Sequence, residues 1–179
     1  MFFNSYTSSQ LQKRDLIDSF YFKIVNVSRN KAFYDDLFVP DTIDGRFDLL
    51  VLFSILLTYY LSRCGSKGQE LSQNLFDKIF LDLDLSLREL GAGDAGVHIK
   101  IKQMINLYMG RQRVYCDCLN NKDFKNLKKH IIKNVYRNVV DFGNSPNLLL
   151  KYCEKIFLEF DCKKEHYFLL NEFNFPKYE

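Results

Sequence analysis

The sequence predicts an all-α protein, a single-domain bundle of about six to seven helices. Apolar residues recur at helical spacing along nearly the whole chain, and no convincing run alternates apolar and polar residues as a strand would. Only three prolines and eight glycines interrupt the 179 residues, which leaves room for long helices. The hydrophobic fraction of 47% and the charged fraction of 26% are ordinary for a globular protein. One domain spanning residues 1–179 is the simplest organisation at this length.

The first half of the chain contains three predicted helices. Apolar side chains at helical spacing predict a helix over residues 8–28, and the turn residues of VPDTIDGRF predict a loop after it. The next helix, at about 45–63, contains the apolar run LLVLFSILLTYYL. A membrane-spanning helix needs about 20 mostly apolar residues, so this shorter run is expected to be a buried core helix. A wide apolar stripe predicts the third helix, at about 69–90.

The second half continues in the same pattern. The fourth helix is expected to start near Asp94 and to reach about residue 119. Two more helices are expected at about 121–140 and 146–161, and a short terminal piece follows Cys162.

The stretch LRELGAGDAG, between the third and fourth helices, matches the letters of a G-x-G-x-x-G phosphate-binding loop. That loop requires a strand before the first glycine and an acidic residue about 20 positions further on. Here a helix precedes Gly91, and a helix rich in Lys and Arg follows. We therefore predict a tight helical hairpin, in which Arg88 takes part. Gly91 ends one helix in the left-handed conformation, Gly93 supplies a free turn and Asp94 caps the next helix.

No local pattern indicates catalysis or a metal site. Asp77, Asp84 and Arg88 share one helix face, where an ion pair at the edge of the core is the preferred interpretation. The three histidines are scattered and the five cysteines lack zinc-binding spacing. The start of the chain does not have the pattern of a signal peptide, which favours reduced thiols. We expect no catalytic residues, metal or cofactor; a helical enzyme using Asp77 and Asp84 with magnesium is the least favoured alternative.

One predicted helix has a basic face. Its residues follow steps of three and four, opposite an apolar face, and are Lys122, Lys125, Lys129, Lys133 and Arg137. Two interpretations stay open: the solvated face of a packed helix, or a surface that lies against anionic lipid or ribosomal RNA. The formal charge of +3 is too small to indicate nucleic acid as the general partner, and DNA is not expected.

Three segments carry a resemblance to a known family. They are FVPDTIDGRFDLLVL, LFDKIFLDLDLSLRELGAGDAGVHIKIKQM and YMGRQRVY. In this order and spacing they resemble the ubiquinol–cytochrome c chaperone family, over about residues 33–140 and most specifically through LRELGAGD. The family includes mitochondrial assembly factors for ubiquinol–cytochrome c reductase and shorter alphaproteobacterial relatives. This chain is short and starts without a transit-peptide pattern, so it is similar to the bacterial form.

The resemblance implies a non-enzymatic, all-helical assembly chaperone. Mitochondrial members, with a small partner protein, associate with the ribosome near its tunnel exit and hold newly made cytochrome b until haem insertion and assembly proceed. The expected partners are therefore nascent or unassembled cytochrome b, a small partner protein and the ribosome. The expected location is the cytoplasm of a bacterium, peripheral to the inner membrane. A ribosome- or RNA-binding helical adaptor without a membrane-protein client is the alternative.

A client made largely of apolar membrane helices needs a surface with exposed apolar or aromatic contacts. The DTIDGRF loop and the tyrosines of YMGRQRVY are the predicted client contacts. The candidate residues are Asp41, Thr42, Asp44, Arg46, Phe47, Tyr108, Arg111 and Tyr115. The basic helix is the predicted contact with the membrane or the ribosome.

Overall fold

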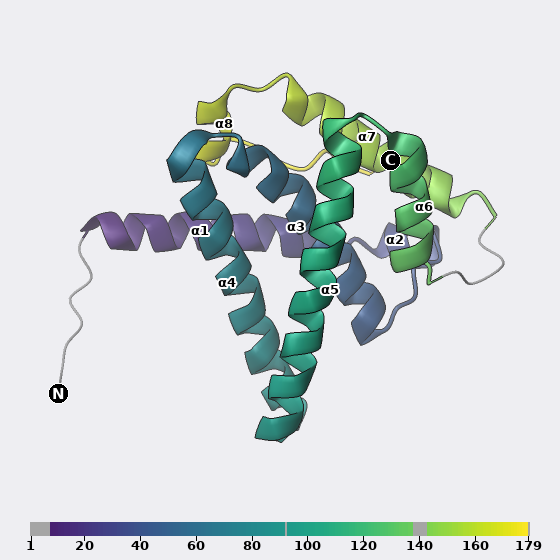
Figure 1. Cartoon of the computed structure of the whole chain (residues 1–179), viewed down its shortest axis with the longest axis horizontal. Coiled ribbons are helices and arrows are strands. Elements are labelled where there is room, and N and C mark those ends of the chain that lie inside the picture. Colours follow the sequence, from purple (N-terminus) through teal and green to yellow (C-terminus); the bar gives the residue numbers. More distant parts are fainter. Residues whose placement is uncertain (1–7, 92, 138–142, 179) are drawn as a thin grey trace.

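The computed structural model describes residues 8–91, 93–137 and 143–178, and this part of the chain contains helices and no strands. The predicted all-α class is confirmed (Figure 1). In chain order the helices are α1 (Ser8–Ser28), α2 (Lys31–Asp35), α3 (Ile43–Ser62), α4 (Gly65–Glu89), α5 (Asp94–Asn120), α6 (Phe124–Asn134), α7 (Ser145–Asp161) and α8 (Glu165–Leu169).

α3 is the central helix of the core. Its apolar run from Leu49 to Leu61 is buried on every side, and α1, α4, α5, α7 and α8 all contact it. Among the described residues, α3 alone has the length and hydropathy of a membrane span, but it lies inside the protein, as predicted. The Thr42 hydroxyl starts the helix by accepting a hydrogen bond from the Gly45 amide at 3.1 Å. Any side chain on Gly45 would collide with the Pro40 carbonyl oxygen.

α4 and α5 form a long hairpin that extends away from the other helices (Figure 1). Gly91 has the predicted left-handed conformation, with φ of +84°. The predicted capping role of Asp94 is wrong. Gly93 occupies the N-cap position of α5, and Asp94 is the first residue of the helix. Asp94 instead pairs with Arg88, whose Nε lies 2.5 Å from Asp84 Oδ2. The expected ion pair between Arg88 and Asp84 is thus present, and it extends across the turn to the start of α5.

Three helix boundaries differ from expectation. α2 lies within the predicted loop, and it starts where the Asn30 side chain accepts a hydrogen bond from the Ala32 amide at 3.1 Å. α4 starts earlier than predicted, at Gly65. The basic helix α6 is shorter than the predicted 121–140, whose residues 138–140 lie outside the described part of the chain.

An extended segment after α8, residues 171–178, completes the core. Phe173 is fully buried, with its ring centroid 5.4 Å from that of Phe20 in α1. The Tyr178 ring lies 5.2 Å from that of Phe33 in α2. The Lys23 ammonium donates to the Phe173 carbonyl oxygen at 2.5 Å, which fixes the segment along α1.

Candidate functional site

A groove of about 490 Å³ lies between α1, the start of α3 and the second half of α4, and Met104 of α5 also lines it. α1 and α4 contact each other where they cross (Figure 1). There the Tyr21 hydroxyl donates to Asp82 Oδ2 at 2.5 Å, and Lys78 Nζ lies 2.9 Å from Asp18 Oδ1. Beyond these contacts α4 continues away from α1 toward the tip of the α4–α5 hairpin (Figure 1). The volume of the groove is within the range of ligand pockets.

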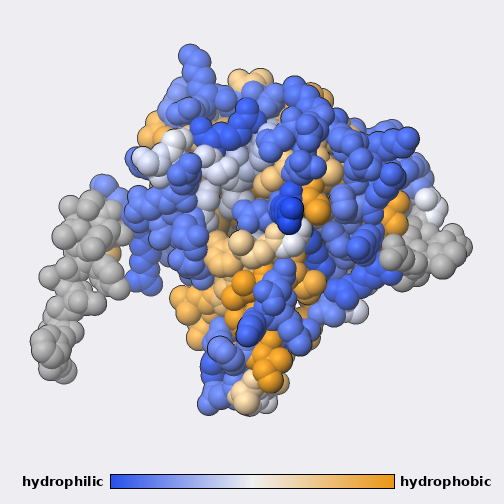
Figure 2. All heavy atoms as spheres, viewed as in Figure 1, coloured by the Kyte–Doolittle hydropathy of each residue, from blue (hydrophilic) through white to orange (hydrophobic). Residues whose placement is uncertain are grey.

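The groove is lined mainly by apolar side chains. They are Val25, Ile43, Phe47, Leu50, Leu83, Leu87, Leu90 and Met104. At its mouth, Ile43 is 58% exposed and Leu90 is 69% exposed. Figure 2 shows further apolar residues gathered on the visible face of the α4–α5 hairpin. An apolar surface of this extent, with polar residues around it, is typical of an interaction site.

Two arginines line the groove together with Tyr34: Arg29, which directly follows α1, and Arg46 of α3. Arg46 Nε donates to Asp41 Oδ1 at 2.6 Å, and its guanidinium lies over the Tyr34 ring, 5.5 Å from the centroid. Burial raises the pKa of Tyr34 to about 12, so its hydroxyl stays neutral at physiological pH. Arg29 lines the same groove, and no carboxylate in the described part of the chain pairs with it. The opposite wall carries Glu89.

The predicted client-contact residues fall into two groups. Asp41 and Thr42 are exposed, Asp44 is half-buried, and Arg46 lines the groove with Phe47, whose side chain is otherwise buried. These five residues follow one another around the start of α3. The structure therefore places the DTIDGRF segment beside the groove.

The expectation that the two tyrosines of YMGRQRVY face a client is wrong. Tyr108 is 1% exposed, and its ring packs edge-on against Phe76 at 5.1 Å. Tyr115 is equally buried, and its hydroxyl accepts a hydrogen bond from Asn134 Nδ2 at 3.1 Å. Both side chains are on the face of α5 that meets the rest of the protein, so their role in the described structure is packing.

A buried carboxylate organises several of the remaining candidate residues. Asp48 of α3 has a fully buried side chain, and Arg111 Nη1 of α5 lies 2.6 Å from its Oδ1. Arg137 Nη2 lies 2.9 Å from Asp48 Oδ2, and its Nη1 lies 3.5 Å from Asp44 Oδ2. Burial raises the pKa of Asp48 above its usual range, while the two arginines oppose that shift. Arg111 is therefore not a surface contact, and Arg137 is not on the basic face of α6.

Sequence reasoning missed Asp48. Its signal is a single acidic residue at the start of a long apolar run, a position where a carboxylate must find a partner. The partner residues come from α5 and from the segment after α6, and no local spacing identifies them.

The basic face of α6 carries three exposed lysines, Lys125, Lys129 and Lys133. Leu127 and Ile131, on the opposite face of the helix, are buried. Lys122 precedes the helix with φ of +51°, and its Nζ lies 3.7 Å from Asp161 Oδ2. Three central lysines of the predicted stripe therefore lie exposed on α6, and their contact with the membrane or the ribosome stays a prediction.

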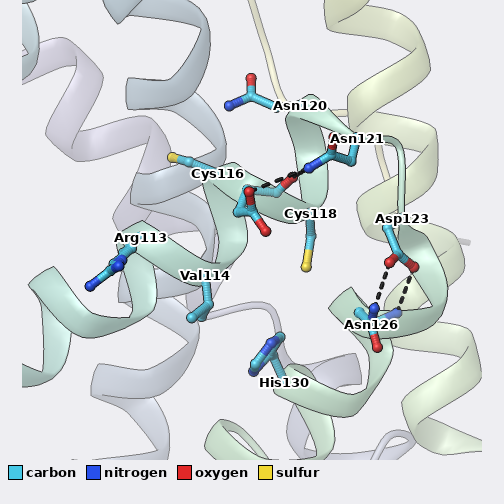
Figure 3. A pocket seen from close by; sticks show the side chains of 10 residues that line it. Arg113, Val114, Cys116, Cys118, Asn120, Asn121, Asp123, Asn126 and His130 are labelled. Carbon is cyan, nitrogen blue, oxygen red and sulfur yellow. Dashed lines mark hydrogen bonds between the residues drawn. The ribbon is translucent and has the colours of Figure 1, made fainter.

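A second cavity, of about 490 Å³, lies between the end of α5 and α6 (Figure 3). Its carboxylates are engaged locally. Asp117 accepts a hydrogen bond from Asn121 Nδ2, and Asp123 caps α6 by accepting from the Asn126 amide at 3.0 Å. The Asn126 amide also holds the pKa of Asp123 below its usual range. Within the described ranges no three His, Cys, Asp or Glu side chains could hold a metal ion. This cavity has the character of a helix-capping region.

Comparisons with known proteins agree with this architecture. A family model described as ubiquinol-cytochrome C chaperone matches residues 35–175. The crystal structure of the Cbp3 homolog from Brucella abortus is similar, with a TM-score of 0.82 and 25% sequence identity. The similarity covers 92% of this chain and 91% of that chain. A search of curated proteins finds no match.

Proposed function

Because the chain belongs to the ubiquinol-cytochrome C chaperone family, we propose that it is a non-enzymatic chaperone that binds newly made cytochrome b during assembly of ubiquinol–cytochrome c reductase. The apolar groove between α1, α3 and α4 is the single observation that carries the choice of client. Helices of a membrane protein expose apolar surface to water until they are inserted, and burying that surface is favourable. A groove with apolar walls and exposed apolar residues at its mouth offers such a surface.

The proposal includes a second contact, through the three lysines of α6. Lys125, Lys129 and Lys133 point away from the core, and a basic face of this kind is attracted to the anionic surface of the ribosome or of the inner membrane. The protein then acts in the bacterial cytoplasm, peripheral to the inner membrane, with a small partner protein as a further expected component. Changing all three lysines to glutamate should abolish association in flotation and sedimentation assays, while the circular dichroism spectrum stays that of the native fold. Unchanged association would refute this second contact.

Site-specific crosslinking during active translation tests the client. A photoreactive residue at Leu90 reports on the groove, and one at Leu158 of α7 is a matched control, because both leucines are 69% exposed. Mass spectrometry of the captured proteins should find cytochrome b from position 90 and not from position 158. Recovery of ribosomal proteins or RNA without cytochrome b would favour the alternative, a ribosome- or RNA-binding adaptor.

A further inference from the structure

We propose that the cavity between the end of α5 and α6 binds one unpaired base of a single-stranded RNA, whose phosphates lie along the lysines of α6. The inference rests on the second contact of the proposed function, and it chooses RNA rather than lipid as the partner of that surface. It follows from the charges of the helix and of the cavity, from the side chains in the cavity that lack a partner, and from the residues that α6 exposes.

The exposed face of α6 has the charge that a phosphate backbone requires. Lys125, Lys129 and Lys133 are exposed, and the sequence contains no acidic residue between positions 124 and 137. In the described part of the chain no carboxylate forms an ion pair with any of the three. Their four-residue steps make a row about 12 Å long. A stacked strand has about one phosphate per 3.4 Å of its axis, so three phosphates lie within reach of the row.

The same face lacks what a bilayer contact requires. A helix that lies on a membrane buries an apolar face at the boundary of the acyl chains. α6 turns Leu127 and Ile131 into the protein, and the exposed residues of the helix are the three lysines and Asn126. None of these four can insert among acyl chains, whereas a phosphate backbone needs no apolar contact. The exposed face of α6 therefore favours RNA.

The cavity beside the row is acidic, so it fits a base and not a phosphate. Asp117 and Asp123 line it, and each accepts a hydrogen bond from an asparagine side chain. The two carboxylates repel a phosphate, whereas a base has no net charge. Lys129 connects the row to the cavity, because its Nζ donates to Asn126 Oδ1 at 3.0 Å and Asn126 lines the cavity. A strand on the lysine row can thus turn one base into the cavity.

Three side chains of the cavity have neither a hydrogen bond nor an ion pair with another described residue. They are Arg113 and Asn120 of α5 and His130 of α6. Figure 3 shows Arg113 and His130 on either side of Val114, with Asn120 toward the other end of the cavity. Unpaired bases stack on imidazole rings and guanidinium planes, and their edges form hydrogen bonds with polar side chains. The cavity offers both kinds of contact.

Two fluorescein-labelled probes of equal charge separate the base from the backbone. One is a nonamer of uridylate, and the other is an abasic nonamer with the same ribose–phosphate chain. In anisotropy titrations the wild-type chain should bind the uridylate probe about tenfold more tightly, which is within the range of base stacking. Arg113→Ala and His130→Ala should each reduce this preference and leave the affinity for the abasic probe unchanged. His166→Ala, at an exposed histidine of α8, is the matched control and should keep the preference.

The lysine row should respond differently from the cavity. Lys129→Gln should weaken the binding of both probes alike, because the probes share their phosphates. The slope of log affinity against log salt concentration should become shallower by about 0.7. Lys151→Gln, at an exposed lysine of α7, is the matched control and should change neither quantity. A uridylate probe with 4-thiouridine should also crosslink to wild type within residues 113–130, a result that does not depend on the folding of any variant.

Equal affinity of wild type for the two probes would overturn the proposal, because the backbone alone would then account for binding. Binding to vesicles that contain phosphatidylglycerol, without binding to either probe, would assign the surface to the membrane and overturn it as well. Sedimentation of the triple lysine-to-glutamate variant with ribosomes separates this inference from the proposed function. If wild type shows no uridylate preference but the variant loses association, the base cavity is wrong and the second contact stands. If the preference is present but the variant stays associated, the RNA chemistry stands and the second contact is wrong.

Discussion

The buried ion cluster at Asp48 makes the strongest prediction about the core. Its carboxylate sits inside the bundle with Arg111 at 2.6 Å and Arg137 at 2.9 Å. Only 9% of the Arg111 side chain is exposed, whereas 42% of the Arg137 side chain is exposed. Arg111→Met removes the buried cation and keeps most of the volume of the side chain, so the loss measured is that of the charge.

The expected magnitude follows from the uncompensated carboxylate. Breaking a buried ion pair by removing one partner costs about 3–5 kcal/mol, because a buried charge is left unpaired. Arg137 still contacts Asp48 in the variant, so we expect the lower end, about 3 kcal/mol of unfolding free energy. Changing Asp48→Leu in the same chain removes the stranded charge and should recover most of that loss, because apolar residues of similar volume often replace a buried pair at little cost.

Urea unfolding, followed by circular dichroism at neutral pH, measures these differences. Arg113→Met, on the same helix but exposed, is the control and should change the unfolding free energy by no more than about 0.5 kcal/mol. A loss below about 1 kcal/mol for Arg111→Met would refute the reasoning. So would a double variant whose loss equals the sum of the two single losses, since the two changes would then be independent.

Three further predictions concern single positions. Gly110→Ala should raise the unfolding free energy by about 0.5–1 kcal/mol, because a Cβ at this position meets no atom. Gly68→Ala should lower the unfolding free energy, because its Cβ would lie 1.9 Å from a carbonyl oxygen of α3. Melting temperatures of the two variants that shift in the same direction would contradict this. Cys162 is exposed and should react with a disulfide reagent at once, whereas Cys153, whose burial raises its thiol pKa, should react only on unfolding; a fast phase that survives Cys162→Ser would contradict this. The lowered pKa of Asp123 means that its cap stabilises the fold above the pKa of the unfolded chain and is lost as the pH falls through the folded-state value. Asp123→Ala should therefore melt at a lower temperature than wild type at pH 7, and the two melting temperatures should converge below about pH 3; an equal gap at both pH values would refute the cap.

The features that the sequence predicts well are those with a local cause. The apolar run of α3 identifies a buried helix because apolar residues on every side leave no face for water. Gly91 identifies a helix end because a left-handed residue there strongly favours glycine. The exposure of the central lysines of α6 could be predicted because their helical spacing places them opposite the apolar Leu127 and Ile131.

The features that it misses depend on distant partners. Helical spacing places Tyr108 and Tyr115 on one face of α5, but it does not say whether that face meets water or other helices. Arg137 continues the basic spacing of α6, yet the helix ends at Asn134 and the side chain turns to Asp48, which is 89 residues away in the chain. The groove has the same character, because its walls come from three helices and no one of them contains the pattern.

The extended segment after α8, residues 171–178, has to be synthesised before the core can be completed. Phe173 and Tyr178 complete aromatic contacts that begin with Phe20 and Phe33. While residue 178 is still being synthesised, the helices that will form the groove have no finished core behind them. A chain whose residues 171–178 have not yet emerged from the ribosome therefore lacks the completed core that supports the helices of the groove.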